Sequence, residues 1–136
     1  MLDTKRKPRD DEEYMNDDHL EYFKAKLLKW KEELLQDSKE VIDRLQDANL
    51  NEPDPMDKAS AELETSSVLR ARDRIRKLIN KINYALQKIE DKTYGYCEET
   101  GEPIGLQRLE ARPVATLSIS AQEQREKHER GHLENK

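Results

Sequence analysis

Apolar residues recur at alternating steps of three and four along two long stretches of the chain. This spacing is typical of helices that bury one narrow face against a partner. The predicted seam of the first stretch is Leu20, Phe23, Leu27, Trp30, Leu34, Asp37, Val41 and Ala48, and that of the second is Ala61, Thr65, Val68, Arg72, Ile75, Ile79, Ile82, Leu86 and Ile89. The pattern therefore predicts two long helices, with Asp37 as a polar step in the first seam and Thr65 and Arg72 as polar steps in the second.

A short acidic segment, NEPDPMDKA at residues 51–59, separates the two helices. Pro53 and Pro55 cannot lie inside a helix without losing a backbone donor and clashing with the preceding turn. Asp54 suits the N-cap of the second helix, with proline at its first position and Asp57 in the capping-box position. The two helices are therefore expected to pack as an antiparallel helical hairpin or two-stranded coiled coil.

The remaining segments differ from the hairpin, which we place at residues 16–92 with its tip at 49–59. Residues 1–15 are charged and lack periodicity, which predicts a flexible tail. Three of the four glycines and two prolines fall within residues 93–121, where we expect turns and short β-strands, for example around Pro103–Gln107. Residues 120–136 predict a charged last helix and tail, and Gly131 suits its C-cap.

Residues 93–121 also have the spacing of a four-cysteine zinc ribbon, C-x2-C-x15–20-C-x2-C. The four positions hold Cys97, Thr100, Ser118 and Ala121. Hydroxyls are poor zinc ligands and alanine offers none, so one thiolate cannot hold the ion. Either the spacing is a coincidence, or the fold has kept its shape and replaced the metal with packing and hydrogen bonds.

Cys97 has two interpretations. The favoured one is a small buried hydrophobic residue, the common state of a free cysteine. The other is a redox-sensitive thiol, which requires exposure and a lowered pKa. The neighbouring Glu98 and Glu99 would raise the pKa of the thiol and so argue against the second. His128 and His132, four residues apart in a charged segment, are expected to face solvent rather than a metal.

Composition and charge exclude several classes of protein. The hydrophobic fraction is 34% and the charged fraction 40%, which suits elongated helices and leaves no membrane-spanning run. One cysteine fits the reducing cytoplasm, and the net charge of −5 argues against general DNA binding. Six acids and one base lie between Asp47 and Glu64, and six bases and one acid between Arg70 and Lys81. This segregation indicates two different binding surfaces on the hairpin.

Five segments together resemble the TraR/DksA family of bacterial transcription factors. The resemblance spans about residues 12–121 and is carried by EEYMNDDHLEYFKAKLLKW, DPMDKAS, LRARDRIRKLINKI, YGYCEETGEPIGLQRLEARP and LSISA. It implies a mainly α fold: a long antiparallel coiled-coil hairpin, a small zinc-finger-like globular domain, here metal-free, and a C-terminal helix. It also implies a monomer that binds RNA polymerase, with its hairpin in the secondary channel, and that acts with guanosine tetraphosphate (ppGpp) on open complexes at rRNA and amino-acid promoters.

The resemblance assigns roles to particular residues. The tip motif D-x-x-D-x-A is met by Asp54, Asp57 and Ala59, and the basic polymerase contact falls on Arg74. The ppGpp site shared with polymerase falls on Leu78, Lys81 and Arg112. A further family lysine is replaced by Gln122, which puts the affinity for ppGpp in doubt. The missing zinc ligands place the chain with family members that lack zinc and stay functional when zinc is scarce.

Two other classes remain as alternatives. The continuous seam would also suit a structural coiled coil that dimerises or tethers other proteins. An enzyme could use Asp54 and Asp57 as a metal-binding or acid–base pair. Against an enzyme, the sequence has no glycine-rich phosphate loop or nucleophile motif near them, and a hairpin tip offers no pocket. We therefore expect a cytoplasmic regulator without enzymatic activity.

Overall fold

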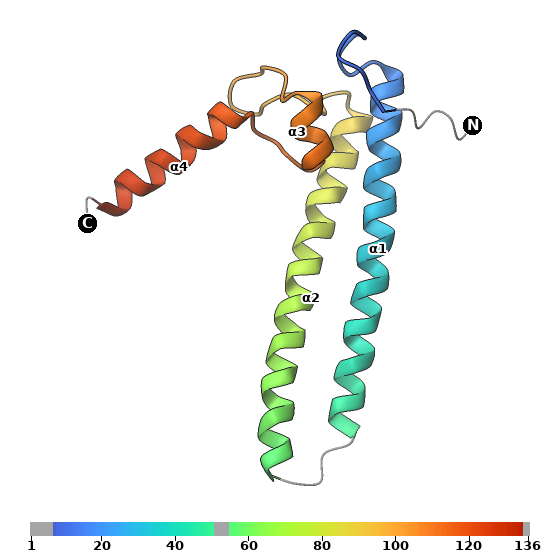
Figure 1. Ribbon diagram of the computed structural model, residues 1–136, viewed down its shortest axis with the longest axis vertical. Helices are drawn as coiled ribbons and strands as arrows, with labels where there is room; N and C mark the ends of the chain where they lie inside the picture. The colour runs from blue at the N-terminus through green and yellow to red at the C-terminus, as the bar shows by residue number, and fades with distance from the viewer. Residues whose placement is uncertain (1–6, 51–54, 135–136) are drawn as a thin grey trace. The chain divides into compact units, whose positions relative to one another are not determined.

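A computed structural model describes residues 7–50 and 55–134 of the chain. Its four helices are α1 (Asp17–Leu50), α2 (Pro55–Glu90), α3 (Leu106–Ala111) and α4 (Ile119–Glu134) (Figure 1). The described residues form two compact units. The hairpin unit comprises Leu28–Asn83, and the globular unit combines the residues up to Leu27 with those from Tyr84 onward.

The hairpin unit contains most of α1 and α2, which lie side by side in opposite directions (Figure 1). Its buried side chains follow the predicted seam at intervals of seven residues: Leu34 and Val41 on α1, and Val68, Ile75 and Ile82 on α2. The two charged residues of the seam, Asp37 and Arg72, are exposed. Because every seventh residue stays on the shared face of a two-helix pair, this narrow stripe is enough to hold the helices together.

The ends of α1 and α2 follow local sequence signals. The Asn16 side-chain oxygen accepts a hydrogen bond from the His19 N–H at 2.9 Å, which identifies Asn16 as the N-cap of α1. Helix α2 begins at Pro55, as the proline at the first helical position predicted. The chain leaves α2 through Lys92, whose φ of 62° is the left-handed conformation that commonly closes a helix.

The core of the globular unit forms around Phe23 of α1. The ring of Phe23 is fully buried and lies 5.6 Å, centroid to centroid, from the ring of Tyr94. The Tyr94 hydroxyl donates a hydrogen bond to the Pro113 carbonyl oxygen at 2.7 Å, so its polar end is satisfied inside the core. The other buried apolar residues of this unit are Leu20, Leu27, Ala85, Ile89, Cys97, Ile104, Leu109, Leu117 and Ala121.

The mainly helical fold predicted from the sequence is confirmed, but two local predictions are wrong. Across residues 7–50 and 55–134 there is no β-strand, only an isolated antiparallel bridge between Tyr96 and Pro103. The segment around Pro103–Gln107 instead leads into α3, whose Leu109 is fully buried in the core. That tertiary contact selects the short helix, which is too short to be stable alone.

Gly131 is the second wrong local prediction, because it lies inside α4 rather than at its C-cap. A glycine inside a helix costs only about 1 kcal/mol relative to alanine. Glu123 and Lys127, like Glu126 and Arg130, are spaced i, i+4 in the favourable order, which supports a solvent-exposed helix. None of the helices, over the residues described, is long and apolar enough to cross a membrane.

Candidate functional site

The predicted tip residues lie at the start of α2. Asp57 and Ala59 fall in the first turns of this helix, and Asp54 lies outside the described residues. The capping role predicted for Asp54 therefore stays a prediction. The position of Pro55 at the first residue of α2 agrees with the start of the helix on which that prediction depends.

The basic run of α2 contains one internal ion-pair cluster. Asp73 lies 2.5 Å from the Arg76 guanidinium and 3.1 Å from the Lys77 ammonium group, measured between the charged N and O atoms. Hydrogen bonds from Arg76 and then Lys77 hold the pKa of Asp73 below its ordinary value. Arg74 and Lys81 are exposed, and no ion pair within the described part of the hairpin unit engages either of them. Cationic side chains on this surface are therefore available to a partner.

The other predicted ppGpp residues are Leu78 in the hairpin unit and Arg112 in the globular unit. Leu78 is half-buried. Arg112 is exposed directly after α3, and its backbone N–H donates to the Arg108 carbonyl oxygen at 2.7 Å. Gln122 donates a hydrogen bond to the Glu126 carboxylate at 3.0 Å, so this amide is already engaged.

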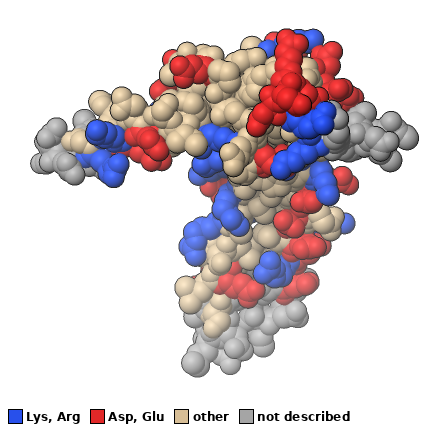
Figure 2. All heavy atoms as spheres, turned by 45° about the horizontal axis from the view of Figure 1, so that its top comes forward, with Lys and Arg blue, Asp and Glu red and all other residues tan. Residues whose placement is uncertain are grey.

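Acidic and basic side chains are interspersed over the face shown in Figure 2. In the globular unit, two of the acids make polar cross-links that sequence reasoning missed. Glu110 of α3 accepts hydrogen bonds from the Tyr22 hydroxyl at 2.7 and 2.9 Å, one to each oxygen, and from Lys26 at 3.0 Å. Partial burial acts to raise the pKa of Glu110, but the bonds from Tyr22 and Lys26 outweigh it and lower the pKa.

Glu98, the residue after Cys97, makes the second cross-link, which joins this part of the chain to the end of α2. Its carboxylate accepts hydrogen bonds from the Tyr84 hydroxyl and, at 3.0 Å, from Lys88. The bond from Tyr84, together with Lys88, lowers the pKa of Glu98. The helical spacing of Tyr84 and Lys88 is visible in the sequence, but their shared partner is ten or more residues away and only the fold brings it close.

The four zinc-spacing positions lie together in the globular unit, but they do not form a metal site. The Thr100 hydroxyl accepts a hydrogen bond from the Glu102 N–H at 3.2 Å. The Ser118 hydroxyl accepts one from the Ala121 N–H at 3.2 Å, and so caps the start of α4. No group of three or more His, Cys, Asp and Glu side chains within the described ranges could hold a metal ion. The residues present therefore do not fit a tetrahedral zinc.

Cys97 is only 3% exposed, as the favoured interpretation predicted, but the expected direction of its pKa is wrong. Burial acts to raise the pKa of the thiol, yet hydrogen bonds from the Thr100 side chain and from backbone N–H groups of Ser118, Thr100 and Glu99 lower it to about 6. The neighbouring carboxylates do not oppose this, because Glu98 binds Tyr84 and Lys88 and Glu99 binds Arg125.

Tyr14 is a further residue that sequence reasoning missed, since residues 1–15 predicted a tail. Its hydroxyl donates to the Gly95 carbonyl oxygen at 2.7 Å and accepts from the Gly105 N–H at 2.9 Å. Its ring packs edge-to-face on Tyr96 with the centroids 5.6 Å apart. The sequence offered a tyrosine among charged residues, at the start of the segment that carries the family resemblance, but no indication of its partners.

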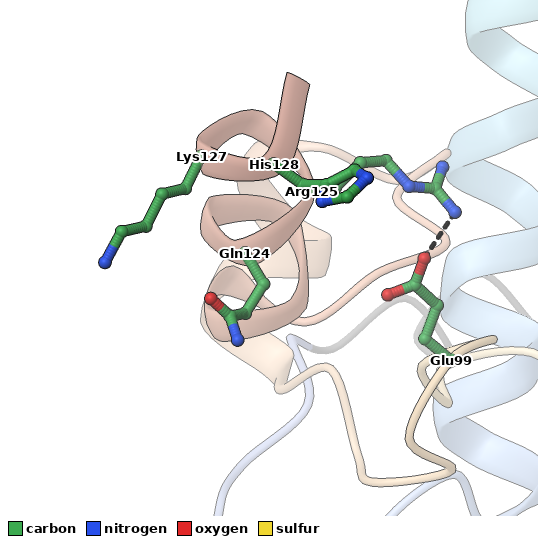
Figure 3. Close-up of a pocket in the computed structure, with 5 residues that line it drawn as sticks. All are labelled: Glu99, Gln124, Arg125, Lys127 and His128. Atoms are coloured by element: carbon green, nitrogen blue, oxygen red, sulfur yellow. Dashed lines mark hydrogen bonds and ion pairs between the residues drawn. The ribbon is translucent and has the colours of Figure 1, made fainter. Parts of the chain in front are cut away.

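A cavity of about 530 Å³ lies beside α4 and is lined by Glu99, Gln124, Arg125, Lys127 and His128 (Figure 3). Arg125 is paired with Glu99, and the Lys127 side chain points away from this pair. His128 is exposed, as predicted, whereas the side chain of His132 lies outside the described residues. Since the charged groups do not converge on one point, this cavity is not a built ligand site.

Two family models match the chain in succession. Residues 19–89 match the model described as DnaK suppressor protein DksA, N-terminal domain. Residues 92–127 match the prokaryotic dksA/traR C4-type zinc finger. The second match includes all four zinc-spacing positions, of which this chain retains only Cys97 as a cysteine.

Relatives with this architecture are similar to the chain over most of its length. An RNA polymerase-binding transcription factor DksA from Caulobacter vibrioides is 57% identical over 95% of this chain and 91% of the relative. The protein of the same name from Escherichia coli K12 is 48% identical over 79% of this chain and 72% of the relative. The solved structure of transcription factor DksA2 from Pseudomonas aeruginosa superposes with a TM-score of 0.82 at 40% identity, covering 86% of this chain and 90% of that one. The chain therefore belongs to the DksA family, as its sequence motifs predicted.

Proposed function

We propose that this chain is an RNA polymerase-binding transcription regulator without enzymatic activity of its own. The observation that carries the proposal is the 57% identity to a polymerase-binding DksA over 95% of the chain, which necessarily includes both units. The hairpin enters the secondary channel of the polymerase and places Asp54, Asp57 and Ala59 near the active centre. There the acidic tip alters the stability of open complexes at rRNA and amino-acid promoters.

The charge on α2 supports a polymerase contact through the side of the hairpin. Arg74 is exposed, whereas the nearby Arg76 and Lys77 are partly neutralised by Asp73. A planar guanidinium that no ion pair among the described residues engages can bind a carboxylate or phosphate through two hydrogen bonds. We therefore propose Arg74 as the basic contact with polymerase.

In the same proposal, ppGpp binds to Leu78, Lys81 and Arg112 together with polymerase groups. A lysine and an arginine are suitable ligands for its phosphates, as a point charge and a planar fork respectively. Gln122 supplies no cation, and its amide is hydrogen-bonded to Glu126. The response to ppGpp is therefore expected to be weaker than in a relative with lysine at this position.

Zinc has no part in the proposed activity. The hydroxyls of Thr100 and Ser118 are engaged in hydrogen bonds to backbone N–H groups, and Ala121 contributes only a buried methyl group. A chelator should therefore leave regulation unchanged. We also propose that the protein acts as a monomer, because its seam is already covered within one hairpin; a solution mass of one chain is the expected result.

In-vitro transcription from an rRNA promoter tests the proposal, with and without ppGpp and a zinc chelator. Wild-type protein should inhibit in each condition, most strongly with ppGpp. Asp57→Asn should keep its helical circular dichroism and its affinity for polymerase while losing most of the inhibition. Asp43→Asn, the same change at an exposed site on α1, is the matched control and should inhibit like wild type. If Asp57→Asn inhibits transcription as strongly as Asp43→Asn, the acidic tip has no regulatory role and serves only to cap the helix.

A further inference from the structure

Within the region matched by the zinc-finger model, two short antiparallel segments, residues 95–97 and 102–105, close the turn that holds Cys97. We call these two segments the arms of the neck. The Cys97 N–H donates to the Glu102 carbonyl oxygen at 2.7 Å, and the Ile104 N–H donates to the Gly95 carbonyl oxygen at 2.8 Å. Between them lies the isolated bridge of Tyr96 with Pro103. A single bridge held by two backbone hydrogen bonds is a small ladder, and isolated hairpins of this kind are marginally stable in water.

In a four-cysteine finger, the metal would fix such a turn from inside. Here the residues at three of the four zinc-spacing positions make other interactions. Ser118 caps α4, Ala121 is buried, and Thr100 bonds the backbone of its own turn and the Cys97 thiol. The Thr100 hydroxyl, which bonds the Cys97 thiol and the Glu102 N–H, joins the two arms beside the turn, but none of these interactions joins them at their other end, at Gly95 and Gly105.

The segment before α1 provides a link of that kind. The Tyr14 hydroxyl donates to Gly95 on one arm and accepts from Gly105 on the other. Gly95 has a φ of 94°, and a Cβ there would lie 2.9 Å from Met15 Cγ, so glycine is required for the segment to come this close. The segment is itself anchored, because the Met15 N–H donates to the buried His19 Nδ1 at 3.2 Å.

We propose that the Tyr14 hydroxyl is the cross-link that holds the two arms of the neck together and so keeps the metal-free finger, residues 95–105, closed. It thereby takes over part of the role of the absent zinc. The finger then depends on a residue about eighty positions earlier in the chain rather than on an ion. The inference rests on the zinc independence of the proposed function, but it makes no use of polymerase. A failure of this inference is therefore distinguishable from a failure of the proposed polymerase-binding function.

Alkylation of Cys97 measures the proposed closure directly, because this single, buried thiol reacts only when the finger opens. The rate is measured under native conditions with the full chain and is divided by the rate in denaturant. Tyr14→Phe keeps the ring on Tyr96 but removes both hydrogen bonds, and should accelerate labelling by about tenfold or more. The matched control is Tyr22→Phe, which removes a hydroxyl from Glu110 elsewhere in the unit and should accelerate labelling much less.

Three results would overturn the proposal. The first is labelling of Tyr14→Phe at the wild-type rate or at the rate of Tyr22→Phe. The second is faster labelling of wild-type protein by a zinc chelator, because a metal would then be holding the finger. The third needs no variant: hydrogen exchange in wild-type protein should show the Gly105 amide protected, and rapid exchange there would exclude the bond to Tyr14. This last measurement decides the case even if Tyr14→Phe does not fold.

Discussion

The cross-link between α1 and α3 through Glu110 gives a prediction whose size can be worked from its contacts. Glu110→Gln keeps the shape of the side chain and one acceptor for Tyr22, but it removes the charge that faces Lys26. Hydrogen bonds to a charged group contribute about 1.5–3 kcal/mol, and partly exposed ion pairs about 0.2–1 kcal/mol. The side chains of Lys26 and Glu110 are 35% and 27% exposed, so solvent screens their pair.

Because glutamine keeps part of the Tyr22 bond, we expect Glu110→Gln to lower the free energy of unfolding by about 1–2 kcal/mol at neutral pH. For a chain of this size that corresponds to a fall in Tm of roughly 3–7 °C. Urea and thermal unfolding, followed by circular dichroism, provide the measurement. Glu102→Gln, the same change at an exposed site of this unit, is the matched control and should stay within about 0.5 kcal/mol of wild type.

A double-mutant cycle then isolates the contact itself. If the hydroxyl of Tyr22 and the carboxylate of Glu110 interact as their 2.7 and 2.9 Å distances indicate, the two substitutions should be non-additive by about 0.5–1.5 kcal/mol. Strict additivity of Tyr22→Phe and Glu110→Gln, or a Glu110→Gln protein as stable as Glu102→Gln, would refute the reasoning.

Two further predictions concern the same unit. Burial and the bond to Glu110 raise the pKa of Tyr22 to about 12 from 10.0. Because the pKa of Tyr22 is raised in the fold, its contribution to stability is fully present below pH 10 and is lost as the pH rises through about 12. Wild-type protein should therefore lose more stability than Tyr22→Phe between these two pH values. Ser118→Ala removes the cap bonded to Ala121 and should cost about 1 kcal/mol, with faster hydrogen exchange in the first turn of α4. Ser66→Ala, the same change at an exposed site on α2, should change neither quantity, and an equal effect of both substitutions on stability would exclude the cap.

The hairpin could be predicted from the sequence because its signals are local. A seven-residue periodicity places Val68, Ile75 and Ile82 on one face whatever lies elsewhere in the chain, and Pro55 marks the start of a helix by its own geometry. The family resemblance came from the same kind of contiguous information. It suggested the tip and the basic contacts, which remain proposals for experiment.

The globular unit could be predicted only in outline, because its contacts join residues far apart in the chain. Helix α3 forms because Leu109 is buried in a core that the sequence pattern could not locate. Sequence neighbours also gave the wrong direction for the pKa of Cys97. Glu98 and Glu99 are adjacent to it in sequence, but in the fold their charges face cationic or hydroxyl partners while N–H groups and the Thr100 hydroxyl surround the sulfur.

The sequence by itself determined that three of the four zinc-spacing positions lack a thiol, since ligand chemistry depends on the residue types alone. Only the tertiary structure decided what those positions do instead: a cap at Ser118, a buried methyl group at Ala121 and a bond from Thr100 to the thiol. It also decided that Tyr14 joins Gly95 to Gly105. A hydrogen bond across eighty-one residues leaves no periodic trace in a sequence, because it depends on how separate segments pack rather than on local spacing.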